Sequence, residues 1–286
     1  MKIGKKEAVM MLFGASTFLT LLFFFMNYLV YILTIVICLF ASSCIAILAE
    51  EAANLLEVES KESTLPVLGP LKHSYLVGFT LGLVTVLSWY FTKNWLLCNL
   101  IACAFCLVSL KTVEIESLPP GMLLLSLLFI YDVFMVFVTP YFTKSGESVM
   151  LYVAQNLDLP IKISMPHLTL EYPSHSCSLI GLGDIIIPGI YISYVSRFGK
   201  QVSLTDWYFL TMMIAYATAL LICGIALWVY GVGQPALLYI VPFLFIATFA
   251  TAWVRGEIVD IWAGNNQSRQ KEIKSQGYAA PDQIEL

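Results

Sequence analysis

The segment Leu127-Leu-Phe-Ile-Tyr-Asp132-Val-Phe-Met-Val-Phe137 places one carboxylate in the middle of an otherwise apolar run. A second such segment is Ser178-Leu-Ile-Gly-Leu-Gly-Asp184-Ile-Ile-Ile-Pro-Gly189. Placing a carboxylate at the centre of a bilayer helix costs about 2.5–3.5 kcal/mol, so a chain that keeps two of them is expected to use them. These segments indicate a membrane protein and direct attention to Asp132 and Asp184.

Composition sets the class of protein. Of the 286 residues, 59% are apolar and only 12% are charged, whereas a soluble domain carries about 25% charged residues. The mean hydropathy is +0.83, which predicts an all-α polytopic membrane protein. The net charge of −4 and the absence of a basic run argue against a nucleic-acid partner. Six of the seven cysteines lie in apolar runs without a nearby histidine, so we predict no metal site and no other cofactor.

Eight segments approach the roughly 20 apolar residues that a spanning helix needs. They are 8–26, 28–48, 75–91, 95–110, 121–139, 178–196, 207–230 and 233–252. With eight spans, 12 of the 15 Lys and Arg residues fall on the side of the two termini, which the positive-inside rule places in the cytosol. We therefore predict a transmembrane core over 1–253 and a disordered cytosolic tail over 254–286.

Two connecting stretches are long enough to matter. The acidic stretch 49–74 is predicted as a cytosolic loop. The stretch 140–177 falls on the opposite, lumenal side, and alternating apolar and polar residues predict short strands at Pro160–Pro166 and Leu168–Tyr172.

The two aspartates are expected at similar depths. Asp132 precedes Pro140 by 8 residues and Asp184 follows Ser178 by 6 residues. At about 1.5 Å per helical residue, both would lie about 9–12 Å from the lumenal face on consecutive antiparallel helices. Two adjacent carboxyls share one proton, so one acts as a base on water while the other protonates the leaving nitrogen. Spacing alone also fits a proton or cation transporter or a leak channel, although the first four spans contain no ionisable residue.

Three motifs occur in a fixed order on three spans. Tyr131-Asp132 lies in 121–139, Gly181-Leu-Gly-Asp184 in 178–196, and Gln234-Pro-Ala-Leu237 in 233–252. This trio resembles the presenilin and signal peptide peptidase superfamily of GxGD intramembrane aspartyl proteases. The string TKSGESVM at 143–150 and the pair Arg197-Phe198 are similar to its signal peptide peptidase-like branch.

The resemblance implies an aspartic endopeptidase without a cofactor, with Asp132 and Asp184 as the catalytic pair. It also implies that Gln234, Pro235, Ala236 and Leu237 hold the substrate and shape the site.

Each residue around the two aspartates has two physical interpretations. Gly181 and Gly183 allow a close backbone approach or a bend, or they simply pack helices. Pro235 either leaves backbone groups free beside the site or merely starts a helix. Tyr131 either donates a hydrogen bond to a carboxyl or fills space.

The family resemblance also implies partners and a location. The substrates would be membrane-spanning proteins, preferably of type II orientation, or signal-peptide remnants within the lipid bilayer of the endomembrane system. The compartment and a homo-oligomeric state are left open. Because a helix hides its amide bonds, the substrate must unwind, and the β-prone stretch 140–177 is predicted to add it as an extra strand.

The chain also departs from the resemblance. Family members usually have nine spans, so the first span is expected to be missing here, and a large lumenal domain is missing too. The chain is then either a short version or one whose beginning is not included. A catalytically silent relative that binds membrane proteins as a chaperone is a further alternative, but the intact pair of aspartates argues against it.

Overall fold

The protein is represented by a computed structural model of residues 1–286. It describes residues 2–3, 6–10, 14, 17, 26–56, 62–65, 69–115, 117–141, 159–160, 162–166, 177–202, 206–230 and 234–263. The chain divides into two compact units. Unit 1 comprises Met1–Thr20, Val113–Ala154 and Ile187–Leu286, and unit 2 comprises Leu21–Thr112 and Gln155–Ile186.

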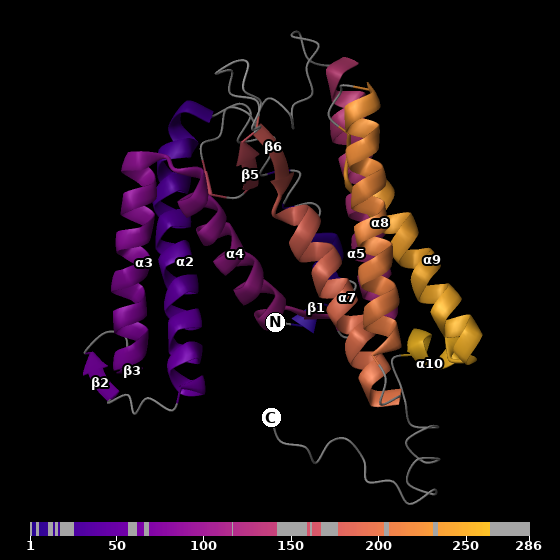
Figure 1. The fold of residues 1–286 in the computed structure, drawn as a ribbon, viewed down its shortest axis with the longest axis horizontal. Helices are drawn as coiled ribbons and strands as arrows, with labels where there is room; N and C mark the ends of the chain where they lie inside the picture. Colours follow the sequence, from indigo (N-terminus) through magenta and orange to yellow (C-terminus); the bar gives the residue numbers. More distant parts are fainter. Residues whose placement is uncertain are drawn as a thin grey trace, which may run out of the picture. The chain divides into compact units, whose positions relative to one another are not determined.

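Long helices dominate the described chain (Figure 1). Among the described residues, six helices are long and apolar enough to cross a bilayer, which confirms the all-helical polytopic class. The helices are α2 (Met26–Leu55), α3 (His73–Thr92), α4 (Trp95–Thr112), α5 (Leu118–Val133) with its π-helical extension η1 (Phe134–Val138), α8 (Trp207–Tyr230) and α9 (Leu237–Arg255). The first predicted span, 8–26, lies mostly outside the described residues.

The remaining elements complete the description. They are β1 (Lys2–Ile3), β2 (Glu62–Leu65), β3 (Gly69–Lys72), β4 (Glu114–Ile115), the 3₁₀ turn η2 (Thr139–Tyr141), β5 (Lys162–Pro166), β6 (Cys177–Gly181), α7 (Gly183–Val202) and α10 (Ile258–Ala263). The strands form three two-stranded pairings: β1 with β4 in parallel, and β2 with β3 and β5 with β6 antiparallel.

The predicted loop 49–74 begins later than expected. Helix α2 continues past residue 48 to Leu55 and takes in Glu50 and Glu51. Lysines of neighbouring elements compensate these charges, because Lys72 Nζ lies 3.2 Å from Glu50 Oε1 and Lys111 pairs with Glu51. The rest of the loop contains the β2–β3 hairpin.

The predicted span 178–196 is wrong at its beginning. Residues Cys177–Gly181 form strand β6, and the helix starts only at Gly183. The reason is tertiary: β5 pairs with β6 and satisfies those of its backbone groups that face β5, so these residues extend as a strand. The strand predicted at Pro160–Pro166 is confirmed as β5, whereas the one predicted at Leu168–Tyr172 lies outside the described residues.

Two glycines of α3 let this helix pack closely against α2 in unit 2. A Cβ placed on Gly82 would lie 2.8 Å from the carbonyl oxygen of Ser42 in α2. One placed on Gly78 would lie 2.6 Å from the Cβ of Ala49. This Gly-x-x-x-Gly spacing lets two helix backbones meet, which is how helices associate in lipid, where burial of apolar surface gives no driving force.

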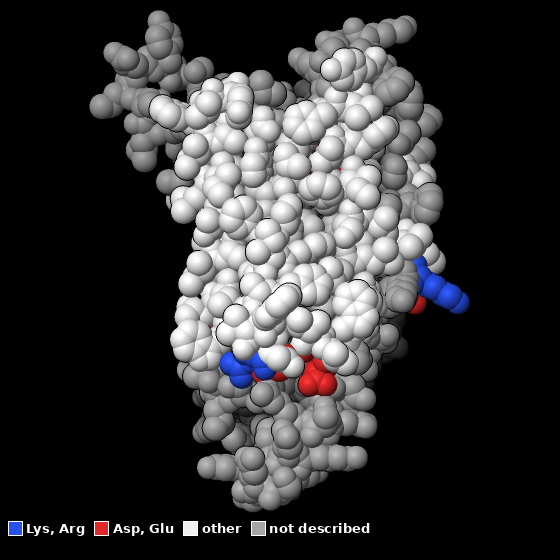
Figure 2. All heavy atoms as spheres, turned by 90° about the vertical axis from the view of Figure 1, so that its right-hand side faces the viewer, with Lys and Arg blue, Asp and Glu red and all other residues white. Residues whose placement is uncertain are grey.

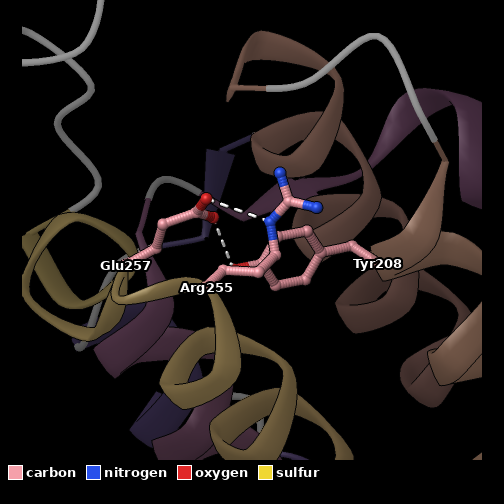
Figure 3. A network of polar contacts seen from close by, with 3 residues as sticks. All are labelled: Tyr208, Arg255 and Glu257. Atoms are coloured by element: carbon pink, nitrogen blue, oxygen red, sulfur yellow. Dashed lines mark hydrogen bonds and ion pairs between the residues drawn. The ribbon is translucent and has the colours of Figure 1, made fainter.

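In unit 1, α8 and the end of α9 are joined by buried polar contacts (Figure 3). The hydroxyl of Tyr208 donates to Glu257 Oε2 at 2.8 Å, and Arg255 Nε donates to Glu257 Oε1 at 3.0 Å. The chain turns there at Gly256, whose φ of 67° is left-handed, and continues into α10. Helix α10 lies inside the predicted tail 254–286, and the rest of that tail, 264–286, is outside the described residues.

The surface on this side is that of a membrane protein. Figure 2 faces the side of Figure 1 on which α8 and α9 lie, and the described Lys, Arg, Asp and Glu are confined to its lower half. Large apolar side chains such as Trp228, Ile246 and Val254 are exposed on these helices. Exposure of this kind is favourable in lipid and unfavourable in water.

Candidate active site

Asp132 lies at the end of α5, with only 4% of its surface exposed. The backbone N–H of Leu237 donates to Asp132 Oδ2 at 3.3 Å. Leu237 is the first residue of α9, and the first N–H groups of a helix have no partner within it. They also form the positive end of the helix dipole. The carboxyl of Asp132 is thus held at the beginning of α9.

The residues before Leu237 explain why this N–H is available. Gln234 and Pro235 are not helical, so α9 begins at Leu237 and not at 233 as predicted. The carbonyl of Pro235 accepts from Leu238 N at 3.2 Å, and that of Ala236 accepts from Tyr239 N at 3.1 Å. Pro235 is buried and leads directly into the first turn.

The helix that carries Asp132 changes its winding immediately after it. Residues Phe134–Val138 form a π-helical turn, in which each backbone N–H bonds five residues back instead of four. Such turns are rare and recur at functional sites. Tyr131 is half-buried beside Asp132, but no hydrogen bond between the two side chains occurs among those of the described residues.

Asp184 occupies the first turn of α7 and is half-buried. The turn begins at Leu182, whose carbonyl accepts from Ile185 N at 3.2 Å and Ile186 N at 2.8 Å. A Cβ on Gly181 would lie 3.5 Å from Asp184 Oδ2, so this glycine lies directly beside the carboxyl. A Cβ on Gly183 would have no described atom within 4 Å, so close contact does not explain that glycine.

The helical geometry behind the predicted depth of Asp184 is wrong, and the depth itself stays a prediction. The estimate of about 9 Å assumed helical residues from Ser178 onward, but residues up to Gly181 are a strand, which rises about 3.3 Å per residue. The structure thus brings Asp132 together with Leu237 in unit 1, and Asp184 together with Gly181 in unit 2. A meeting of the two carboxyls stays a prediction.

One residue that binds strand β5 was missed in the sequence. Asn99, in the apolar helix α4, donates through Nδ2 to the carbonyl of Ser164 at 2.9 Å and accepts from the N–H of Ser164 at 2.9 Å. The signal was present, because an amide inside a predicted span is costly unless it finds a partner. Among the described residues, no group of three or more His, Cys, Asp or Glu is placed to hold a metal ion.

Comparison with known proteins agrees with these motifs. A family model described as signal peptide peptidase matches residues 1–268. Signal peptide peptidase-like 2B of Gallus gallus is 35% identical over 268 residues, covering 86% of this chain and 45% of that protein. Signal peptide peptidase-like 2A of Homo sapiens is 36% identical over 206 residues, covering 67% of this chain and 39% of that protein. The chain therefore spans less than half the length of these relatives.

Proposed function

Because the chain belongs to the signal peptide peptidase family of intramembrane aspartic proteases, we propose that it cleaves membrane-spanning proteins within the bilayer, using Asp132 and Asp184. The observation that carries the proposal is the burial of Asp132 against the N–H of Leu237. A buried carboxyl in a membrane-spanning helix is costly without a partner, and here the beginning of the helix that follows Gln234-Pro-Ala supplies one.

The chemistry follows from two carboxyls that share one proton. The ionised one removes a proton from water as the water oxygen attacks the scissile carbonyl carbon. The protonated one donates a hydrogen bond to the carbonyl oxygen, and a proton reaches the leaving nitrogen as the C–N bond breaks. Since Leu237 N–H binds Asp132 Oδ2, we assign Oδ1 to this reaction.

The β5–β6 ribbon supports a way to hold an unwound substrate. Both backbone groups of Ser164 face Asn99, and in an antiparallel ladder such a residue and its partner, Leu179, form a non-hydrogen-bonded pair. The N–H and C=O of Leu179 therefore point away from β5. Two residues on, Gly181 presents its groups to the same outer edge of β6. Among the described strands none pairs with that edge, and it ends beside Asp184.

We assign the substrate to this edge as an added strand. Its backbone would be satisfied by β6 while its scissile bond lies near Asp184. Membrane-spanning segments of type II orientation and signal-peptide remnants are the substrate classes proposed. An endomembrane location with cytosolic termini is also proposed, supported by the distribution of Lys and Arg.

The test compares Asp132→Asn and Asp184→Asn with the wild-type chain. Each protein is purified in detergent with a type II single-span peptide, and the products are identified by mass spectrometry. An Asn oxygen still accepts from Leu237 N–H, so the Asp132 variant should fold. Both variants should lose cleavage by about 10⁴-fold or more, because loss of one essential group disables the unit. Asp206→Asn, at the exposed start of α8, is the matched control and should cleave normally.

Two outcomes would contradict the proposal. Appreciable cleavage by one of the two Asn variants would contradict the pair mechanism. An inert wild type that instead carries an aspartate-dependent proton or cation flux in proteoliposomes would replace the protease by a transporter or channel.

A further inference from the structure

The amide of Asn99 takes the place of a third strand. It lies in α4, a span of mean hydropathy 1.8, and makes two reciprocal hydrogen bonds of 2.9 Å with the backbone of Ser164 in β5. A primary amide presents a donor and an acceptor side by side, as the backbone of a neighbouring strand does. The outer edge of β5 is therefore closed by a side chain, and the ribbon is bound to α4.

The bonding also selects one register. If β5 shifted by one residue against β6, the strand would turn over. The N–H and C=O of Ser164, which Asn99 now binds, would then point toward β6. A shift of two residues in one direction would place Pro166 opposite the amide, and proline has no N–H to donate. A shift of two residues in the other direction would place Lys162 opposite the amide. The carbonyl oxygen of Lys162 already lies 3.7 Å from Cys98 Sγ. Ser164 is thus the position along β5 that satisfies both groups of Asn99 without displacing another contact.

The same face of α4 holds the turn that carries Asp184. Ala102 and Cys106 follow Asn99 at helical spacing and form a cluster with Leu182, which Ile163, Ile185 and Ile186 join. Leu182 lies between the end of β6 at Gly181 and the start of α7 at Gly183. One helix face therefore fixes the ribbon by hydrogen bonds and the following turn by apolar contacts.

We propose that Asn99 is a positioning residue that sets the register of the β5–β6 ribbon, and with it the peptide bond that the enzyme cuts. The inference rests on the proposed protease function. If the substrate adds to the outer edge of β6, the bond that reaches Asp184 depends on where β6 lies relative to the turn at Leu182, which α4 holds separately. A ribbon that shifts along α4 would present neighbouring bonds to the same carboxyl.

The test uses Asn99→Leu in the full chain, with the type II single-span peptide as substrate. The variant keeps the size of the side chain and removes both hydrogen bonds. Wild type should cut mainly at one bond, whereas the variant should spread its cuts over adjacent bonds and exchange the Ser164 amide hydrogen about tenfold faster. Asn94→Ala is the matched control, because Asn94 Oδ1 accepts from Leu96 N–H at 2.9 Å at the start of the same helix. It weakens α4 without touching β5, so it should leave the cut sites unchanged.

Asn99→Gln keeps the amide but lengthens the side chain by one methylene, so it provides a second variant if the Leu variant does not fold. Its cut sites should also shift. Wild-type cut sites in a folded Asn99 variant would overturn the proposal, whatever the rate. If the wild type is inert, the proposed protease function fails, and hydrogen exchange then tests the role of Asn99 alone. Faster exchange of the Ser164 amide hydrogen in the variant supports Asn99 as the residue that fixes the ribbon, and unchanged exchange overturns that role.

Discussion

The outer edge of β6 allows a test of how an unwound substrate is held. We predict that Leu179→Pro lowers cleavage while the protein stays folded. Leu179 faces Ser164 across the ladder as a non-hydrogen-bonded pair, so its N–H points away from β5. Proline is tolerated at such edge positions because it removes no hydrogen bond of the existing ladder.

The size of the effect follows from one lost donor. A substrate carbonyl that paired with Leu179 N–H would be left buried without a partner, which costs about 1–3 kcal/mol. Each 1.36 kcal/mol corresponds to a factor of about ten, so kcat/KM should fall roughly 5-fold to 150-fold. The loss should appear with single-span substrates that must unwind.

The assay measures kcat/KM by mass spectrometry of the products, together with hydrogen exchange of the ribbon. Leu179→Ala removes the same side chain but keeps the N–H, so it should cleave faster than the proline variant. Ile180→Pro removes an N–H that points toward Ile163, so it should open the ribbon itself. Equal kcat/KM for the Pro and Ala variants at Leu179, with an intact ribbon, would refute strand addition at this edge. Opening of the ribbon by Leu179→Pro would refute the assignment of the edge.

Three further predictions concern stability in detergent. Gly82→Ala should lower the free energy of unfolding by about 1–3 kcal/mol, because its Cβ would lie 2.8 Å from the backbone of Ser42. Gly224→Ala, in α8 with no described atom within 4 Å, should raise it by about 1 kcal/mol, and the reverse order would contradict the reasoning. Tyr208→Phe removes the 2.8 Å hydrogen bond to buried Glu257 and should cost about 1.5–3 kcal/mol. A double-mutant cycle with Glu257→Gln that shows no coupling would contradict that assignment.

Some elements were predictable because a local property fixes them. The segment 207–230 was predicted from its apolar length, and α8 has the same bounds. In the same way α3 and α4 start and end within two residues of the predicted 75–91 and 95–110. A bilayer leaves the backbone few options other than a helix, so hydropathy alone suffices there.

Other elements failed because their partners are distant in the chain. Residues 177–181 are as apolar as a spanning helix, yet they form a strand because β5 supplies the pairing. The start of α9 moved to Leu237 because Gln234 and Pro235 stay outside the helix, and this frees the N–H that binds Asp132. Neither feature is visible in the hydropathy of the segment itself.

The sequence by itself thus determined the class of protein and the residues to examine. Apolar length and the cost of charge in lipid identify the spans and single out Asp132 and Asp184. Only the tertiary structure decided what those residues touch. Leu237 meets Asp132 across 105 residues, and Asn99 meets Ser164 across 65. These contacts pair polar groups, each of which would cost free energy in a bilayer without a hydrogen-bond partner. The fold, and not the local sequence, decides which of these groups become partners.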